Sequence, residues 1–185
     1  IDYTDRTTCI LFGDGAAATL IESNDEPSLW AFKFGTDGRG ANTLLATENG
    51  FRNSEDAISP RHRRRWKSDL YMDGPALINF TVGQIPGMLQ EVLQDAEMTS
   101  QDVGYYLFHQ ATYKMLSQLQ QVMEVEESKV PILLRDLGNT VSSTLPILIN
   151  QMRSRGDMTP EMKNMLVGFG VGWSWAGCVW QDVAR

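Results

Sequence analysis

Two hydrophobic patterns alternate along the chain. Short apolar runs indicate buried strands, and longer stretches with an apolar residue at every third or fourth position indicate helices that bury one face. The expected strands are 30–34, 105–108, 129–134, 166–169 and 173–180. From residue 30 the order is strand, loop, helix, strand, helix, strand, helix, strand, strand. This order predicts an α/β fold, a mixed sheet with helices on both faces.

Three amphipathic helices are expected between these strands. The first begins at 73–75, and Pro86 inside it should kink or split it. The second runs over about 111–124, and the third over 142–152 with Pro146 near its start. The inward-facing positions of the first two are Leu77, Ile78, Val82, Ile85, Leu89 and Leu93, then Met115, Leu116, Leu119, Val122 and Met123.

The N-terminal segment predicts two further strands around a tight turn. Residues 8–12 form one apolar run, 13–15 read Gly-Asp-Gly, and 16–22 resume with small and β-branched residues. Glycine permits such a turn, and small side chains suit close packing. A helix over 16–20 is the alternative, but that run is too short to stand as one.

A long polar stretch, 35–67, interrupts the regular elements. Loops of this length in compact domains are often functional. Its basic end, 61–67, contains four arginines and a lysine. That end fits either contact with an acidic partner or phosphate, or, as the more frequent case, a solvated charged loop.

Composition narrows the possible classes. With 185 residues and 42 % hydrophobic content, the chain can form one domain with a real core. A net charge of −7 argues against general nucleic-acid binding, and no apolar run is long enough to span a bilayer. Two cysteines, Cys9 and Cys178, make neither a disulfide framework nor a zinc site, so a cytoplasmic location is expected. The first residues are acidic and lack an initiating Met, so we expect a chain that begins inside a longer protein.

Chemistry-bearing residues follow three of the apolar runs. His109 ends the run 105–108, Asn139 lies within Gly-Asn-Thr, and a glycine-rich turn spans 168–172. Ligands of open α/β sheets bind at the carboxyl ends of strands, so these groups are expected to share one site. Taken singly, each has a plain alternative: a structural histidine, a turn asparagine and a simple hairpin.

Four motifs occur in one order: Phe12-Gly-Asp-Gly-Ala-Ala-Ala18, His109-Gln-Ala111, Gly138-Asn-Thr140 and Gly168-Phe-Gly-Val-Gly172 with Trp175. Together they resemble the beta-ketoacyl-acyl-carrier-protein synthase III family of thiolase-fold condensing enzymes. Members are about twice this length and are built from two similar halves. The resemblance implies that 1–29 supply the last strands of the N-terminal half and that 30–185 form the C-terminal half. It also implies that the nucleophilic cysteine lies outside this chain, while Cys9 and Cys178 are core residues.

The family's chemistry explains the residue types. A cysteine thiolate takes an acyl group from acyl-CoA, and malonyl on an acyl carrier protein then loses carbon dioxide to give an enolate that attacks it. By resemblance, His109 and Asn139 are the hydrogen-bond donors to the enolate oxygen. The loop Gly170, Val171, Gly172 resembles the oxyanion loop, and Phe169 resembles the aromatic residue beside the nucleophile. No metal or other cofactor is implied.

Substrate positions are implied less directly. Arg6 resembles the arginine that packs on the adenine of coenzyme A, and Gly74 and Leu77 resemble residues of the pantetheine tunnel and acyl pocket. Thr112 stands, like Pro75, where the typical fatty-acid enzyme has asparagine. Lys114 takes the place of a basic residue that docks the acidic carrier protein. Other basic docking positions are replaced, by Asn79, Gln121 and Val122, which favours a specialised homologue.

The leading hypothesis is therefore an acyltransferase half that is inactive alone and acts in fatty acid or polyketide synthesis. Its expected partners are acyl-CoA, acyl carrier protein and the missing half or a companion chain, as a homodimer at full length, with neither nucleic acid nor membrane involved. Two alternatives remain: a non-catalytic subunit that binds coenzyme A or carrier protein, and an acyltransferase with a non-malonyl acceptor.

Overall fold

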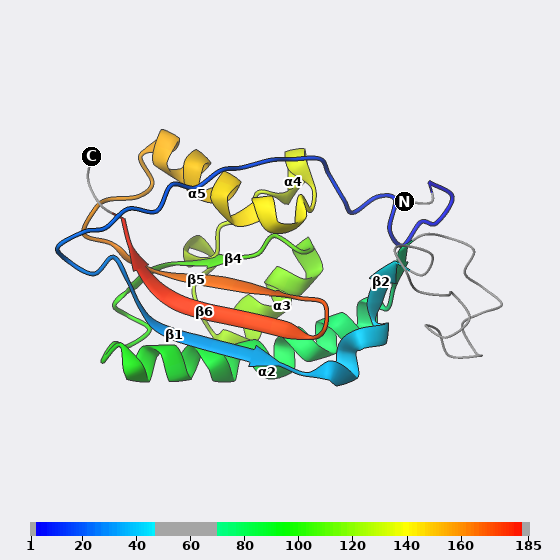
Figure 1. Cartoon of the computed structure of the whole chain (residues 1–185), viewed down its shortest axis with the longest axis horizontal. Helices are drawn as coiled ribbons and strands as arrows, with labels where there is room; N and C mark the ends of the chain where they lie inside the picture. The colour runs from blue at the N-terminus through cyan, green and yellow to red at the C-terminus, as the bar shows by residue number, and fades with distance from the viewer. Residues whose placement is uncertain (1–2, 47–69, 183–185) are drawn as a thin grey trace.

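A four-stranded mixed sheet organises the structure, a computed structural model that describes residues 3–46 and 70–182 (Figure 1). The basic run 61–67 lies outside these residues. The strand order is β1-β6-β5-β4, antiparallel except for the parallel pair β5 and β4. The bounds are Leu29–Thr36 (β1), Val103–Phe108 (β4), Lys163–Gly170 (β5) and Ser174–Gln181 (β6).

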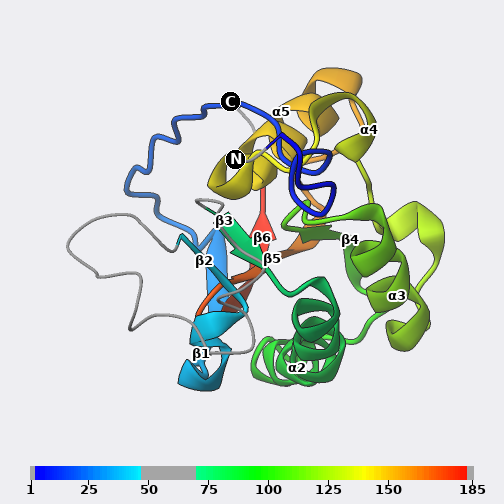
Figure 2. The ribbon, with the colours of Figure 1, turned by 90° about the vertical axis from the view of Figure 1, so that its right-hand side faces the viewer.

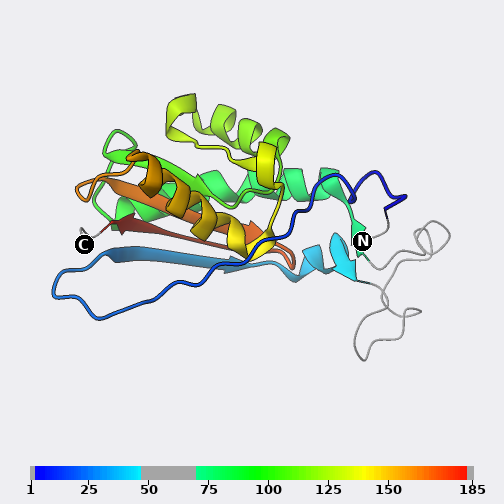
Figure 3. The ribbon, with the colours of Figure 1, turned by 90° about the horizontal axis from the view of Figure 1, so that it is seen from above.

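Helices cover both faces of this sheet, as the sequence pattern predicts (Figure 2). Helices α2 (Gly74–Asp95) and α3 (Tyr113–Met123) pack on one face in the main core cluster. Helix α5 (Thr144–Arg155) covers the other face in a second cluster with Leu107 and Trp180. Figure 1 shows α5 above the strands and α2 below them, and Figure 3, seen from above, shows α5 lying over the strands.

The apolar run at 105–108 is almost unbroken because strand β4 is buried on both faces. Successive side chains of a strand point to opposite faces. Tyr106 and Phe108 therefore join the cluster of α2 and α3, while Leu107 joins that of α5. All three are buried, so both faces of β4 are excluded from water.

Helix α2 is one continuous element of 22 residues, so Pro86 does not split it, while the alternative, a kink, stays a prediction. Its start is fixed by Asp73, whose carboxylate accepts from the N–H of Ala76 at 3.0 Å. Proline removes only one backbone donor, and buried residues on both sides of it, Ile85 and Met88, anchor the helix to the core.

Helix α3 has the predicted position and inner face, with one exception. Thr112 caps it by accepting from the N–H of Met115 at 3.1 Å. Met115, Leu116 and Leu119 are buried. Val122, predicted to face inward, is 53 % exposed on the last turn, and the helix ends one residue later.

The strand predicted for 129–134 is absent. Instead a 3-10 turn (η2, Glu127–Lys129) and a short helix (α4, Leu134–Leu137) flank an irregular stretch. The side chain of buried Gln110 takes the place of a neighbouring strand. Its Nε2 donates to the Pro131 carbonyl at 3.3 Å, and its Oε1 accepts from Leu133 N–H at 2.8 Å.

The two strands predicted within 8–22 are also absent. Residues 3–11 form turns, and 16–22 run as an extended, exposed segment without regular pairing. One bridge remains, between Phe12 and Asn139. A strand needs a hydrogen-bonded neighbour, and no described segment lies alongside 16–22 as one.

The polar stretch 35–67 contains regular structure where it is described. A 3-10 turn (η1, Gly38–Asn42) leads into β2 (Leu44–Ala46), which pairs antiparallel with β3 (Leu70–Met72) in a separate small sheet. In the described part of the chain, none of the helices combines the length and apolarity that crossing a bilayer requires.

Candidate active site

His109 continues directly from the carboxyl end of β4. Its backbone N–H donates to the Val167 carbonyl on β5 at 2.8 Å, so the strand pairing extends to this residue. The imidazole meets the ring of Phe169 edge-on, with 5.7 Å between centroids. His109 and Phe169 therefore occupy adjacent strand ends, as the sequence predicts.

The buried Thr144 holds the other side of the imidazole. His109 Nδ1 lies 2.6 Å from Thr144 Oγ1, which belongs to the first residue of α5. Burial lowers the pKa of His109 to about 4, because the charged ring loses its hydration. The imidazole is therefore neutral near pH 7.

Asn139 lies on a turn that the N-terminal segment fixes in place. Asn139 N–H donates to the Leu11 carbonyl at 2.8 Å, and Gly13 N–H donates to the Asn139 carbonyl at 3.0 Å. Gly138 has a positive φ of 65°, and a Cβ there would lie 2.9 Å from the Leu11 carbonyl oxygen. Only glycine fits this close approach without strain.

The Asn139 carboxamide has a defined orientation. Its Oδ1 accepts from the N–H of Val141 at 2.8 Å. The amide end, Nδ2, is therefore the end available to donate to a ligand. Val141 makes this contact with φ 55°, an uncommon conformation for a β-branched residue.

The peptide groups of Val141 connect the two candidate groups. Its N–H binds Asn139 Oδ1, and its carbonyl accepts from Thr144 Oγ1 at 2.8 Å. Thr144 in turn contacts His109. His109 and Asn139, distant in sequence, thus belong to one hydrogen-bonded cluster next to Phe169.

The glycine-rich loop lies one step beyond Phe169. A tight turn joins β5 and β6 as predicted, but it comprises Val171, Gly172 and Trp173, and Gly170 is the last residue of β5. Val171 is 48 % exposed, and Gly172 has φ 130°. The loop is therefore at the same end of the sheet as His109.

The predicted substrate residues are spread more widely. Arg6 and Lys114 are exposed, and Gly74 is in the first turn of α2. Leu77 is buried in the main core cluster. Thr112 uses its hydroxyl to cap α3. The roles of these five residues stay predictions.

The cysteines are separate from this cluster. Cys178 is buried on β6, and burial raises the pKa of its thiol to about 11, so the thiol stays protonated at neutral pH. Cys9 is half-buried in a turn rather than in the predicted strand. Within the described residues, no group of three or more His, Cys, Asp or Glu side chains is arranged to hold a metal ion.

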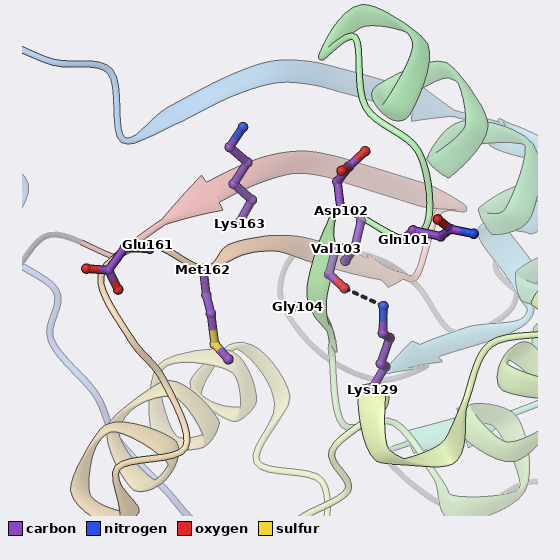
Figure 4. A pocket seen from close by; sticks show the side chains of 8 residues that line it. All are labelled: Gln101, Asp102, Val103, Gly104, Lys129, Glu161, Met162 and Lys163. Atoms are coloured by element: carbon purple, nitrogen blue, oxygen red, sulfur yellow. Dashed lines mark hydrogen bonds between the residues drawn. The ribbon is translucent and has the colours of Figure 1, made fainter.

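Two surface cavities lie away from His109 and Asn139. One, of about 400 Å³, is at the amino end of β4 and β5 (Figure 4). There Lys129 Nζ donates to the Val103 carbonyl at 2.8 Å. The other, of about 1060 Å³, lies between the extended segment 16–24 and α5. Neither is lined by His109 or Asn139.

Sequence reasoning missed three residues that build the site: Gln110, Val141 and Thr144. Gln110 is adjacent to His109 in the motif, and a buried polar residue beside an apolar run is a usable signal. Thr144 follows Asn139 by five residues, at the start of an expected helix. Nothing in the sequence pattern signals the left-handed conformation of Val141.

The sheet between two helical layers, with polar groups gathered at the strand ends, is a thiolase-like α/β fold. Residues 93–182 match the family description 3-oxoacyl-[acyl-carrier-protein (ACP)] synthase III C terminal, and residues 1–38 match 3-oxoacyl-[acyl-carrier-protein (ACP)] synthase III. The chain belongs to the 3-oxoacyl-[acyl-carrier-protein] synthase III family, as the resemblance predicted.

Comparison with known relatives shows what share of a family member's length this chain covers. Beta-ketoacyl-[acyl-carrier-protein] synthase III of Lactococcus lactis subsp. lactis is 33 % identical over 182 residues, which is 97 % of this chain and 54 % of the relative. The Thermus thermophilus synthase III structure matches with TM-score 0.86 at 27 % identity, over 100 % of this chain and 56 % of that one.

A priming beta-ketosynthase of the R1128 polyketide pathway matches with TM-score 0.81 at 27 % identity, over 98 % of this chain and 53 % of that one. The chain thus spans about half the length of the relatives it matches.

Proposed function

We propose that this chain supplies the enolate-stabilising half of a decarboxylating condensing enzyme, a 3-oxoacyl-[acyl-carrier-protein] synthase III. The observation that carries the proposal is the oriented carboxamide of Asn139, whose Oδ1 is bound by Val141 N–H so that Nδ2 is available to donate. It lies in one hydrogen-bonded cluster with His109, and the chain belongs to a family whose named relatives are such synthases.

The reaction requires groups that stabilise the negative charge that develops on the substrate. When the bond from the malonyl carbon to its carboxylate breaks, carbon dioxide leaves and the electron pair forms an enolate on the thioester oxygen. Donors aimed at that oxygen lower the barrier without reorganising. Asn139 Nδ2 is the first such donor, and His109 is the second when its ring carries a proton on the free nitrogen.

The enolate carbon then attacks the acyl-enzyme carbonyl, a carbon–carbon bond forms, and the cysteine thiolate leaves. The Gly170–Gly172 loop supports the preceding acyl transfer by presenting a backbone N–H, near Val171, to the thioester oxygen. Phe169, edge-on to His109, forms an apolar wall of the site.

The nucleophilic cysteine belongs to the half that this chain does not contain. Cys178 is unsuited because its pKa is raised to about 11, whereas nucleophilic cysteines have lowered pKa values. Residues 1–29 belong with that other half and 30–185 with this one. The chain alone therefore forms no 3-oxoacyl product.

Substrate contacts follow the family pattern. Acyl-CoA is the acyl donor, with Arg6 at its adenine and Gly74, Leu77 and Thr112 along the pantetheine and acyl path. The acyl carrier protein, which is acidic, docks near exposed Lys114. Full-length protein acts as a homodimer in fatty acid or polyketide synthesis.

The test measures carbon dioxide release from malonyl-acyl carrier protein by full-length protein. His109→Gln and Asn139→Ala are each expected to lower the rate about 10²–10³-fold, the usual cost of one oxyanion donor. Asn150→Ala, at an exposed position of α5, is the matched control and should leave the rate unchanged. Unaltered decarboxylation in both site variants would refute the proposal and favour a non-catalytic binding subunit.

A further inference from the structure

We propose that Trp173 is a positioning residue, whose indole is hydrogen-bonded to Thr43 and so fixes the Gly170–Gly172 loop relative to the start of α2. The inference rests on the proposed function, because that function gives the backbone N–H near Val171 its role in acyl transfer. Its structural content, the bond between Trp173 and Thr43, can be measured without turnover.

Trp173 is the last residue of the turn between β5 and β6, two positions after Val171. Its N–H donates to the Asp37 carbonyl, and Asp37 N–H donates to the Trp173 carbonyl at 2.8 Å. These two bonds extend the pairing of β1 with β6 by one residue beyond Thr36 and Ser174. The backbone that leaves the loop is therefore fixed at the edge of the sheet.

The indole ring of Trp173 packs against two other elements. It stacks on Phe80 of α2, with 5.0 Å between centroids and 6° between planes. It also lies against buried Gly40 of η1, where a Cβ would come within 2.3 Å of Trp173 Cγ. Only glycine leaves room for the ring at that position. Figure 1 shows η1 next to the turn that joins β5 and β6.

The hydrogen bond of the indole has a single possible direction. An indole N–H can only donate, and Trp173 Nε1 lies 2.9 Å from Thr43 Oγ1. The Thr43 hydroxyl donates its own hydrogen to the Gly40 carbonyl at 2.7 Å. Its oxygen is therefore left to accept from the indole, and all three groups have the partner that they need.

Thr43 also contacts the start of α2. Its carbonyl accepts from Asp73 N–H at 2.7 Å, and Asp73 caps α2 by accepting from Ala76 N–H at 3.0 Å. The next residue, Gly74, is one that the proposed function assigns to the pantetheine path. Thr43 thus connects the turn that carries the oxyanion N–H with the helix end assigned to the substrate.

This connection matters for acyl transfer. The cysteine thiolate adds to the acyl-CoA carbonyl carbon, the carbonyl electron pair moves to the oxygen, and the coenzyme A thiolate leaves when that pair returns. The loop N–H stabilises the charged oxygen only at hydrogen-bond distance, and a displacement of about 1 Å can cost about 10²-fold in rate. Trp173 acts through the loop, by preventing such a displacement.

Two substitutions in full-length protein remove the bond with little change of shape. Trp173→Phe keeps an aromatic ring on Phe80, and Thr43→Val keeps the branched side chain. Each should lower kcat for coenzyme A release from acyl-CoA at least about tenfold, with little change in KM. Carbon dioxide release from malonyl-acyl carrier protein should be unaffected, because Asn139 is oriented by other contacts. Normal kcat for acyl transfer in Trp173→Phe overturns the proposal.

A rescue and a double variant separate positioning from packing. Thr43→Ser keeps the hydroxyl and should restore the wild-type kcat. Trp173→Phe combined with Thr43→Val should be no slower than the slower single variant, because both remove the same bond. Losses that multiply in the double variant overturn the proposal. Trp30→Phe is the matched control, since Trp30 pairs with Val179 towards the other end of the sheet.

Hydrogen exchange of the indole N–H measures the bond directly. The Trp173 Nε1–H signal in nitrogen-15 NMR, assigned by its loss in Trp173→Phe, should exchange slowly in the wild type and in Thr43→Ser, and faster in Thr43→Val. Unchanged exchange in folded Thr43→Val overturns the proposal. Should Thr43→Val fail to fold, the acyl-transfer rate of Trp173→Phe and the wild-type exchange rate decide the question.

The two proposals fail separately. If Trp173→Phe transfers acyl groups normally while Asn139→Ala loses decarboxylation, the proposed function stands and the positioning role of Trp173 falls. If His109→Gln and Asn139→Ala both decarboxylate normally while Trp173→Phe loses acyl transfer, the enolate-stabilising role falls and the positioning role stands.

Discussion

Val141 N–H binds Oδ1 of Asn139 at 2.8 Å, and this single contact decides which end of the carboxamide faces outward. Without it the side chain could rotate and present either oxygen or nitrogen. The contact depends on Val141 having φ 55°. An unfavourable backbone conformation is thus retained at the position that orients a candidate catalytic group, where such strain is often found.

Asn139→Asp tests the value of the free amide end. The carboxylate can still accept from Val141 N–H, but its outward atom becomes an oxygen that repels an enolate. We expect decarboxylation to fall at least about 10²-fold, with the fold preserved. Asn150→Asp, on an exposed position of α5, is the matched control. Equal rates for the two variants would remove Asn139 from the donor role.

Val141→Gly tests the backbone strain. Glycine adopts a positive φ freely and keeps both the N–H and the carbonyl, so the contacts to Asn139 and Thr144 should survive. Relief of strain opposes the added entropy of the unfolded chain, and we expect the free energy of unfolding to change by less than about 1 kcal/mol. Val141→Pro can neither adopt this positive φ nor donate an N–H, so it should lose the turn and with it the activity. Denaturant unfolding and the decarboxylation assay measure both effects.

The pH dependence of stability should report the burial of His109. Its folded pKa is about 4, below the unfolded value of 6.5. As pH falls below 6.5 the unfolded chain takes up a proton that the folded protein does not, so stability decreases until about pH 4. The loss should reach about 3 kcal/mol, with no contribution from this group above pH 7.

Denaturant unfolding from pH 7.5 to 4, compared between wild type and His109→Gln, isolates this effect from the carboxylates. The variant should lose less stability over that range. Identical slopes for the two proteins would show that His109 is not desolvated in the folded state.

Two glutamines with buried side-chain atoms, Gln110 and Gln118, should respond differently to substitution by leucine. Gln110 binds the carbonyls of Phe108 and Pro131 and the N–H of Leu133. Gln110→Leu leaves those groups unpaired and should cost about 1–3 kcal/mol. Gln118 Oε1 is buried without a partner, so Gln118→Leu should be neutral or stabilising. Thermal unfolding of the pair tests this, and equal losses would contradict the bonds assigned to Gln110.

The sequence predicted best the elements whose apolar residues form a continuous buried stripe or fill both faces. Helix α2 and strand β4 follow directly from apolar spacing, because each buries a continuous stripe or both faces. The strand-end rule also placed His109 and the Gly170–Gly172 turn at one end of the sheet. Asn139 follows the short helix α4 and not a strand, so this rule did not locate it. These features depend on local pattern and on the topology of α/β sheets.

The predicted strands that the structure lacks share a different cause. The run 129–134 has the composition of a strand, yet the Gln110 side chain satisfies its backbone groups. Residues 8–22 contain strand-like runs that find no partner among the described residues. Pairing partners are tertiary information that a local pattern does not contain. The contact between Thr144 and His109 likewise cannot be seen until the turn is folded.

The bridge between Phe12 and Asn139 joins positions more than a hundred residues apart. The bridge consists of two backbone hydrogen bonds, from Asn139 N–H to the Leu11 carbonyl and from Gly13 N–H to the Asn139 carbonyl. The N-terminal segment therefore holds the backbone that carries the Asn139 carboxamide. An event that displaces that segment, such as proteolytic nicking, should therefore also displace the carboxamide of Asn139.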